Sequence, residues 1–270
     1  MRRWRRMKQL LLALVVVFLL IATTTYAAPA FVQTGYSECT GCTSLNVNFN
    51  MPDDKPGSED VTAGNLIVVT VRTDNTNGPV NSITSNPGNQ TCLLGKRQVS
   101  QTAFWLEVWY CPNATGGATT ITVNNSGAAD GLRVALAEYS GVALSSPVDG
   151  TPVSAAATGA TANAGNITTT VANALIHIGA GTDGNADFGT NAVPPAGCDD
   201  HFLGPDPGAG SDKTATASCL AATPGSYPTT MANANDTWAA VAVAFSPSGG
   251  AVTTSAISGG LRGSGGLRIQ

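Results

Sequence analysis

Short runs of alternating or β-branched apolar residues recur along this chain, and clusters of Gly, Pro, Asn and Asp separate them. In the stretch LNVNFN, Leu45, Val47 and Phe49 alternate with asparagines, which is the period of a strand with one buried face. Further runs occupy residues 65–73, 118–124, 132–139, 166–171, 174–179, 214–220 and 238–245. No helical pattern of about 10–15 residues lies between these runs. The sequence therefore predicts an all-β fold, a single antiparallel β-sandwich of jelly-roll type with disulfides.

The two ends of the chain differ in composition from this strand-rich part. Residues 1–28 hold five basic side chains and an apolar run from Leu10 to Ala22. The run is too short for a membrane span of about 20 residues, so a secretory signal peptide is predicted, and an uncleaved anchor is the alternative. Residues 31–247 form the predicted sandwich domain. Residues 248–270 are rich in Gly and Ser and contain GGLR twice; a flexible tail is predicted, with an attachment peptide as the alternative.

Cleavage of the signal peptide would leave a secreted, extracellular protein with no stable membrane span. The signal peptide holds five of the 13 basic residues and none of the 17 acidic ones, so eight basic residues remain against 17 acidic ones and the formal charge becomes −9. We expect no nucleic-acid partner and no anionic membrane partner for so acidic a chain, which has no basic stripe.

Six cysteines indicate a disulfide-bonded fold, which export permits. They are Cys39, Cys42, Cys92, Cys111, Cys198 and Cys219. We predict a hairpin that turns at Gln101–Thr102 and sets Cys92 opposite Cys111. The other facing pairs in this register are Leu94 with Trp109, Lys96 with Glu107, and Gln98 with Trp105. One register thus gives a disulfide and an opposite-charge pair, whereas the pairing of the other four cysteines stays open.

The motif CTGC, which contains Cys39 and Cys42, is also typical of redox centres and of half a zinc site. A complete zinc site needs two more ligands, and the chain offers only two histidines and four other cysteines. No βαβ pattern surrounds the motif. We therefore expect structural disulfides, formed within the motif or with other cysteines.

The predicted hairpin sorts its aromatic residues by face. Trp105, Glu107 and Trp109 share one face of the strand, and the alternate residues from Phe104 to Tyr110 share the other. If the second face is core, the first presents two tryptophans around a charge, which suits stacking on a sugar. The alternative is that a loop or a neighbouring subunit covers these rings.

Two acidic loops are candidate cation sites. In DGNADFG, Asp183, Asn185 and Asp187 alternate like the first ligands of a calcium loop, although Pro194 stands where a bidentate glutamate is needed. The turn TDNTNG, which begins with Thr73-Asp74, is a second oxygen-rich segment. Calcium is therefore a candidate cofactor, and ordinary Asx turns are the alternative.

Three titratable side chains lie in predicted strands or loops without a catalytic motif around them. Glu138 precedes the turn at residues 139–141, and we expect its carboxylate to accept backbone N–H groups of that turn. His177 is predicted to be a strand histidine at the edge of a layer, and His201 a surface residue in a long loop. The chain has no G-x-S-x-G, H-E-x-x-H or P-loop motif. We predict no catalytic residues and no enzymatic activity.

Two strand-like segments resemble each other. RVALAEYSG and AAVAVAFSP each have a face lined by alanine and a similar ending. The similarity indicates two halves, but Ala and Val are common throughout the chain, so composition alone explains it equally well and we predict no repeat.

Four fragments together carry a wider resemblance: VTAGNLIVVTV, NATGGATTITV, LRVALAEYSGV followed by SPVDGT, and WAAVAVAFSP. They resemble secreted bacterial and phage-associated β-sandwich proteins, most of which have no assigned function. The similarity covers most of Val61 to Pro247 and lies in turn and strand patterns. It implies a sandwich domain displayed outside the cell or on a particle, and it transfers no catalytic residues.

These observations predict a secreted structural or adhesive protein that acts by self-association or by attachment to a surface. Charge-poor strands rich in Thr, Asn and Ala suit packed extracellular assemblies. The expected partner is another copy of the chain or a surface glycan. A carbohydrate-binding module that uses Trp105 and Trp109 is the second hypothesis, and a glycosidase or lyase on the same fold is the third.

Overall fold

The described part of the chain consists of strands joined by turns, bends and loops, with no helix, and the strands pair antiparallel. The structure, a computed structural model, describes residues 28–49, 60–74, 78–101, 104–129, 131–184, 197–203 and 213–249. Nearly all of the predicted signal peptide and tail lie outside these ranges. The all-β class is confirmed for the described part of the chain.

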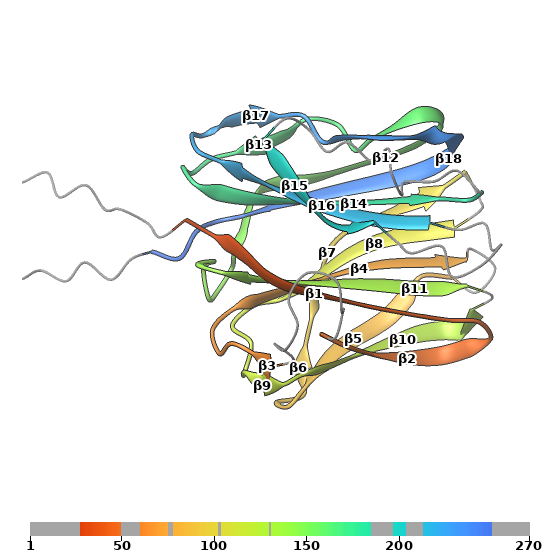
Figure 1. Cartoon of the computed structure of the whole chain (residues 1–270), viewed down its shortest axis with the longest axis horizontal. Coiled ribbons are helices and arrows are strands. Elements are labelled where there is room, and N and C mark those ends of the chain that lie inside the picture. The colour runs from red at the N-terminus through yellow and green to blue at the C-terminus, as the bar shows by residue number, and fades with distance from the viewer. Residues whose placement is uncertain are drawn as a thin grey trace, which may run out of the picture. The chain divides into compact units, whose positions relative to one another are not determined.

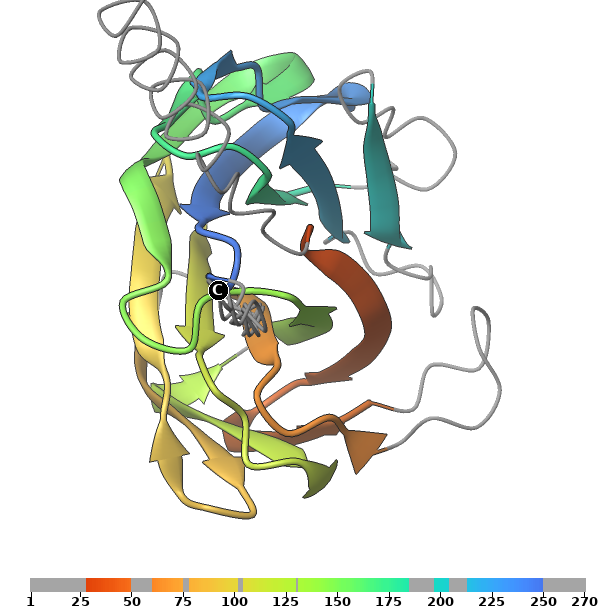
Figure 2. The same cartoon turned by 90° about the vertical axis from the view of Figure 1, so that its left-hand side faces the viewer.

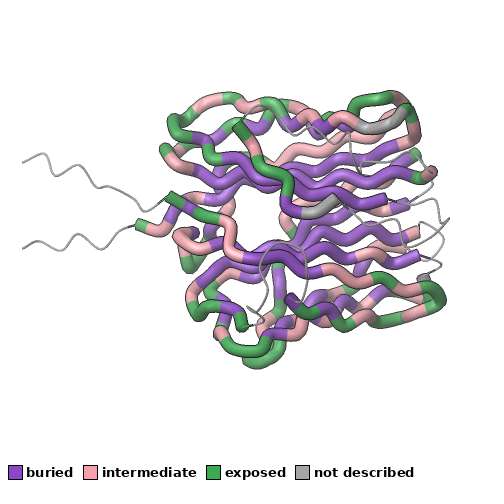
Figure 3. The backbone as a smooth tube through the Cα atoms, viewed as in Figure 1, coloured by how far each residue is buried: buried purple, intermediate pink, exposed green. Residues whose placement is uncertain are grey.

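A central sheet runs through the middle of the unit formed by Tyr26–Ser248 (Figure 1). Its strands, in spatial order, are β1 (Ala30–Cys39), β11 (Leu132–Ser140), β4 (Leu66–Asp74), β8 (Phe104–Cys111) and β7 (Leu93–Ser100). Strands β11, β4 and β8 are buried on both faces, as the purple segments of Figure 3 illustrate. A strand covered on both sides has no solvent face, which is why the β4 sequence LIVVTV is continuously apolar instead of alternating.

Two further sheets cover the faces of the central sheet (Figures 1 and 2). The lower sheet contains, in order, β2 (Cys42–Asn48), β10 (Thr120–Ala129), β5 (Val80–Asn86) and β6 (Gln90–Thr91). The upper sheet contains β12 (Val148–Asn163), β18 (Thr230–Phe245), β14 (Ala174–Thr182), β16 (Lys213–Ala221) and β15 (Cys198–Leu203). Two short pairs complete the described strands: β3 (Asp60–Val61) with β9 (Gly117–Ala118), and β13 (Ile167–Thr169) with β17 (Gly225–Tyr227).

Three apolar cores follow from this layering. The first, around Val69 and Ile121, lies between the lower and central sheets. The second, around Val68 and Val241, lies between the central and upper sheets. The third fills the far side of the upper sheet, where Trp238 packs among many alanines.

The central and upper sheets repeat one topology. Strands β1, β11, β4, β8 and β7 correspond in turn to β12, β18, β14, β16 and β15. The registers agree as well, because Ile67 faces Cys111 in the central sheet and Ile176 faces Cys219 in the upper sheet. We therefore describe strands β1 to β11 as the first half of the chain and β12 to β18 as the second half.

The similarity between RVALAEYSG and AAVAVAFSP belongs to this repeat. The first segment contains the end of β11 and the second the end of β18. Tyr139 faces Leu66 in the first half, and Phe245 faces Leu175 in the second. The two segments occupy corresponding places in corresponding sheets, so the prediction of no repeat was wrong and the alternative of two halves describes the structure.

The predicted single sandwich is found only in part. Three main sheets are present where a sandwich has two, and the upper sheet curls into a half-barrel (Figure 2). Its two longest strands, β12 and β18, bend together where their register shifts near Asp149 and Gly159. The disulfides and the antiparallel sheets are as expected, whereas the jelly-roll arrangement is not confirmed.

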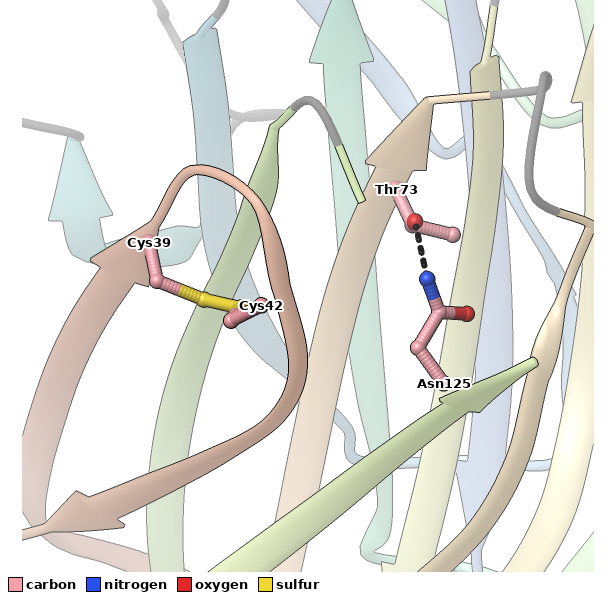
Figure 4. Close-up of a disulfide and its surroundings, with 4 residues drawn as sticks. All are labelled: Cys39, Cys42, Thr73 and Asn125. Atoms are coloured by element: carbon pink, nitrogen blue, oxygen red, sulfur yellow. Dashed lines mark hydrogen bonds between the residues drawn. A yellow bond between two sulfur atoms is a disulfide. The ribbon is translucent and has the colours of Figure 1, made fainter. Parts of the chain in front are cut away.

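Three disulfides use all six cysteines. The predicted Cys92–Cys111 bond joins the start of β7 to the end of β8, and its counterpart in the second half, Cys198–Cys219, joins β15 to β16. The C-x-x-C motif forms a local disulfide between two of its own residues, at the turn from β1 to β2 (Figure 4). The prediction of a structural disulfide for this motif is confirmed.

The predicted register of the hairpin is correct only at its open end. Leu94 faces Trp109 as expected, but a bulge at Gly95 moves the rest by one residue, so that Arg97 faces Glu107. The prediction that Lys96 pairs with this glutamate was therefore wrong. A Cβ atom at Gly95 would lie 3.1 Å from a methyl group of Val243 in the upper sheet, and glycine permits this close approach.

Candidate functional site

The face that carries Trp105, Glu107 and Trp109 is inside the protein. Glu107 is fully buried and Trp109 nearly so, because the lower sheet covers this side of β8. Trp105 is half-buried, with the guanidinium of Arg97 5.8 Å from its ring centre. The structure thus does not present Trp105 and Trp109 as an exposed pair. The cover over Trp109 is the lower sheet, whereas the alternative predicted a loop or a neighbouring subunit.

The Glu107 carboxylate instead organises the contact between the two sheets. It accepts hydrogen bonds from the backbone N–H of Val80 at 2.9 Å and from the indole Nε1 of Trp109 at 2.7 Å. Arg97 places Nη2 3.0 Å from Oε2, the oxygen that also accepts from Trp109. A buried charge is stable only with such partners.

Glu138 is also fully buried, but it does not bind its own turn. Its carboxylate accepts hydrogen bonds from the backbone N–H of Thr62 at 2.8 Å, from the Asn65 amide at 2.6 Å and from the Gln33 amide. The expectation that it caps residues 139–141 was therefore wrong. Glu138 fixes the turn that precedes β4, which is brought beside it by strand pairing and not by sequence proximity.

The first predicted calcium loop is described only at its beginning. Asn185 and Asp187 lie outside the described residues, and the Asp183 carboxylate lies 3.7 Å from Nη2 of Arg72. Asp74, from the second loop, forms a 2.9 Å ion pair with the same guanidinium. Arg72 is fully buried and faces the ring of Phe104 at 4.4 Å. The Arg72 guanidinium thus supplies the counter-charge to both carboxylates.

The described ranges contain no group of three or more Asp, Glu, His or Cys side chains with the arrangement of a metal site. The same ranges contain no helix with the length and apolar character of a membrane span.

Both histidines of the chain lie in one buried seam between the central and upper sheets. His177 hydrogen-bonds through Nε2 to the Thr70 hydroxyl at 2.9 Å and through Nδ1 to the Tyr139 hydroxyl at 3.0 Å. Complete burial, with a smaller effect from His201, lowers the pKa of His177 to about 3. The imidazole is therefore neutral, with one ring nitrogen as donor and the other as acceptor. It bonds to strands β4 and β11, which both belong to the first half.

His201 continues the seam towards the edge of the sheets. Its Nε2 lies 2.5 Å from the Ser218 hydroxyl, and its ring stacks on Phe31 with the centres 3.8 Å apart. Ser218 also bonds to Tyr139, whose pKa is raised by burial and lowered less by that hydrogen bond. The predictions of a layer-edge His177 and a surface His201 were both wrong, because pairing of β14 with β16 and of β15 with β16 carries the two rings between the layers.

The serine–histidine pair in this seam has the residue types of a nucleophile and its base. However, Ser218 and His201 are each only 8% exposed, and their hydrogen bonds are made within the seam. In the first half, the positions that correspond to His177 and Ser218 hold Val68 and Tyr110. The seam therefore consists of buried polar contacts that hold the two repeated halves together.

The outer face of the lower sheet carries an ordered set of uncharged polar side chains. We call it the polar grid; it consists of Ser44, Asn46 and Asn48 on β2, Thr120, Thr122 and Asn124 on β10, and Ser82, Thr84 and Asn86 on β5. Facing residues form three rows across the three strands. Alternate residues such as Val47, Ile83 and Ile121 point inward to the first core.

Side-chain hydrogen bonds connect neighbouring strands within each row of the polar grid. Thr120 donates through Oγ1 to Oδ1 of Asn48, and Thr122 donates to Oδ1 of Asn46, both at 2.8 Å. Asn124 donates through Nδ2 to the Ser82 hydroxyl at 3.3 Å. The alternation of LNVNFN indicated one polar face, but the grid needs three strands from distant parts of the sequence.

A hydrogen bond and a disulfide lie where the lower sheet meets the central sheet. Asn125 donates through Nδ2 to the Thr73 hydroxyl at 3.3 Å, and the Cys39–Cys42 disulfide lies near this bond (Figure 4). The polar grid is thus held on a cross-linked support.

No protein-family model and no curated protein matches this chain. The resemblance to secreted β-sandwich proteins therefore remains a prediction based on the four fragments named above.

Proposed function

We propose that this chain is a secreted, disulfide-bonded attachment protein that binds an extracellular surface and catalyses no reaction. The polar grid is the observation that carries the proposal. It offers nine hydrogen-bonding side chains on one sheet face without a single charge. Side chains fixed by their neighbours lose little entropy on binding, which favours a recognition surface.

Three further observations support this role. The disulfides fit an oxidising location outside the cell. The buried Ser218–His201 pair is bonded within the seam and nearly closed to solvent, which favours binding over catalysis. The double layer of repeated halves gives the grid a thick, rigid base.

Retention of the purified secreted protein on insoluble cell-envelope and extracellular-matrix preparations tests the proposal. We expect most of the protein to sediment with at least one such material. Light scattering on the same sample measures self-association. A protein that stays in the supernatant with every preparation while forming large assemblies on its own would contradict surface attachment and favour a self-associating structural role.

A further inference from the structure

We propose that the polar grid binds a neutral polysaccharide, with its hydroxyl groups as the recognised chemistry. This inference rests on the proposed attachment function and assigns the ligand class of the same surface. Three properties of the grid support it: its hydrogen-bonding pattern, its lack of charge and its size.

The hydrogen bonds inside the grid fix which groups face the partner. Asn46 and Asn48 accept through Oδ1 from Thr122 and Thr120, so their Nδ2 groups are oriented as donors. The two threonine hydroxyls have committed their protons and keep their oxygen lone pairs as acceptors. Donors on β2 therefore lie beside acceptors on β10. A sugar hydroxyl both donates and accepts, so a row of hydroxyls complements this pattern.

The charge of the grid selects against ionic polymers. Its residues include no Asp, Glu, Lys or Arg, and the whole chain is acidic, with a net charge of −4. An acidic polysaccharide would meet no cation in the grid and would be repelled by the rest of the protein. A basic polymer would meet no carboxylate there. A neutral polysaccharide needs no charged partner in the grid and is not repelled by the acidic chain.

The size of the grid argues against a second copy of the protein as its partner. Strands lie about 4.8 Å apart and alternate residues about 6.8 Å apart, so the outermost Cα atoms span about 10 Å by 14 Å. With the side chains included, this surface covers roughly 300 Å², well below the roughly 800 Å² per partner of a stable protein–protein interface. A single extended polysaccharide chain a few sugars long fits such an area.

The grid contains no aromatic ring, so each site lacks the stacking surface that strengthens many sugar complexes. Binding to a single oligosaccharide is therefore expected to be weak. An insoluble polysaccharide presents many parallel chains, and a polymer surface offers rebinding that raises retention. Insoluble material is for this reason the probe to use.

The test measures depletion of the purified secreted protein by insoluble neutral polysaccharides (cellulose, chitin and β-1,3-glucan) and by an acidic alginate gel. The grid variant combines Asn46→Asp with Thr122→Val, which keep side-chain size while adding a charge and removing a hydroxyl. Its matched control combines Asn166→Asp with Thr158→Val, at exposed residues of the second half. Circular dichroism and melting temperature confirm folding of both variants.

We expect the protein to bind at least one neutral polysaccharide. The grid variant should lose about thirtyfold in affinity, since two hydrogen-bonding positions are each worth on the order of 1 kcal/mol. The control should stay within about twofold. Equal binding by the grid variant and wild type would overturn the assignment to the grid. Grid-dependent retention on alginate or cell envelopes, with no binding to neutral polysaccharides, would overturn the ligand class while leaving surface attachment intact.

Discussion

The Nδ1 atom of His177, in the second half of the chain, lies 3.0 Å from the hydroxyl of Tyr139, in the first half. This contact sits between layers that pack closely, since a Cβ atom at Gly179 would lie only 2.8 Å from a methyl group of Thr70. The two repeated halves therefore meet through a polar contact that has no room to rearrange. A charged group in this contact would be buried away from water, which is energetically unfavourable.

Acid should destabilise the protein through His177. Its pKa is about 3 in the folded state and 6.5 when unperturbed, so the unfolded chain takes up a proton at higher pH than the folded chain. The stability contributed by the neutral ring is complete above pH 6.5 and is lost as the pH falls towards 3. We expect a loss of about 3 kcal/mol between pH 7 and pH 4 from this group.

Urea denaturation at both pH values measures this effect, and His177→Gln separates it from the titration of carboxylates. The variant should be less stable at pH 7 but lose less stability between pH 7 and pH 4 than wild type. An identical acid-induced loss in wild type and variant would show that His177 is not the titrating group.

Glu138→Gln should destabilise the fold strongly and leave ligand binding unchanged. The substituted amide turns an NH2 group towards Thr62, Asn65 or Gln33, all of which donate hydrogen bonds to this site. We expect a loss of about 2–4 kcal/mol in the free energy of unfolding. The measurement is denaturant unfolding at pH 7 together with the polysaccharide depletion assay.

Glu38→Gln is the matched control, because this partly exposed glutamate lies 3.4 Å from Arg133 at the surface. Its effect should remain within about 1 kcal/mol. Comparable losses of unfolding free energy in the two variants would mean that burial of Glu138 does not determine the destabilisation. Lost polysaccharide binding with unchanged stability would instead assign Glu138 a functional role.

The sequence was sufficient for local features. Alternation in LNVNFN predicted the strand that contains Leu45 and Val47, and the short separation of Cys92 and Cys111 predicted their bond, as found. These inferences need only the period of a strand and the reach of a hairpin. The one-residue shift at Gly95 was missed because strand alternation and hairpin reach do not reveal a bulge, and the close packing of Gly95 against Val243 involves the other half of the chain.

The contacts of Glu138 and the polar grid depend on long-range pairing and were therefore not predictable. Glu138 binds a turn 73–76 residues away in the sequence. The polar grid unites Asn46 with Thr122 only because β2 pairs with β10. The repeat was visible in two segments, but without the registers of Ile67 and Ile176 it could not be distinguished from a shared preference for alanine and valine.

The two corresponding disulfides should stabilise the two halves to similar extents. Cys92–Cys111 closes a loop of 19 residues and Cys198–Cys219 one of 21 residues. Restriction of the unfolded chain then gives about 3 kcal/mol for each. We expect the paired alanine variants to lose equal stability in urea, within about 1 kcal/mol.

The Cys39–Cys42 bond provides an internal comparison, because its sequence separation is only 3. The same relation gives about 1.6 kcal/mol for its removal. A larger loss here than for either of the other two bonds would show that the turn between β1 and β2 gains its stability from the bond through native contacts and not through loop closure.

Calcium should not stabilise this protein, because Arg72 already supplies the positive charge beside Asp74 and Asp183. The guanidinium is fully buried and also donates from Nε to the Thr182 carbonyl at 3.1 Å, so it cannot leave without exposing the second core. A divalent ion bound by Asp183 would lie next to this cation and be repelled. We expect the melting temperature in 5 mM calcium, on the order of the weakest extracellular sites, to equal that in chelator. A calcium-dependent rise of several degrees that disappears in Asp187→Asn, but persists in the matched Asp199→Asn, would instead establish the DGNADFG loop as a metal site and contradict this assignment of Arg72.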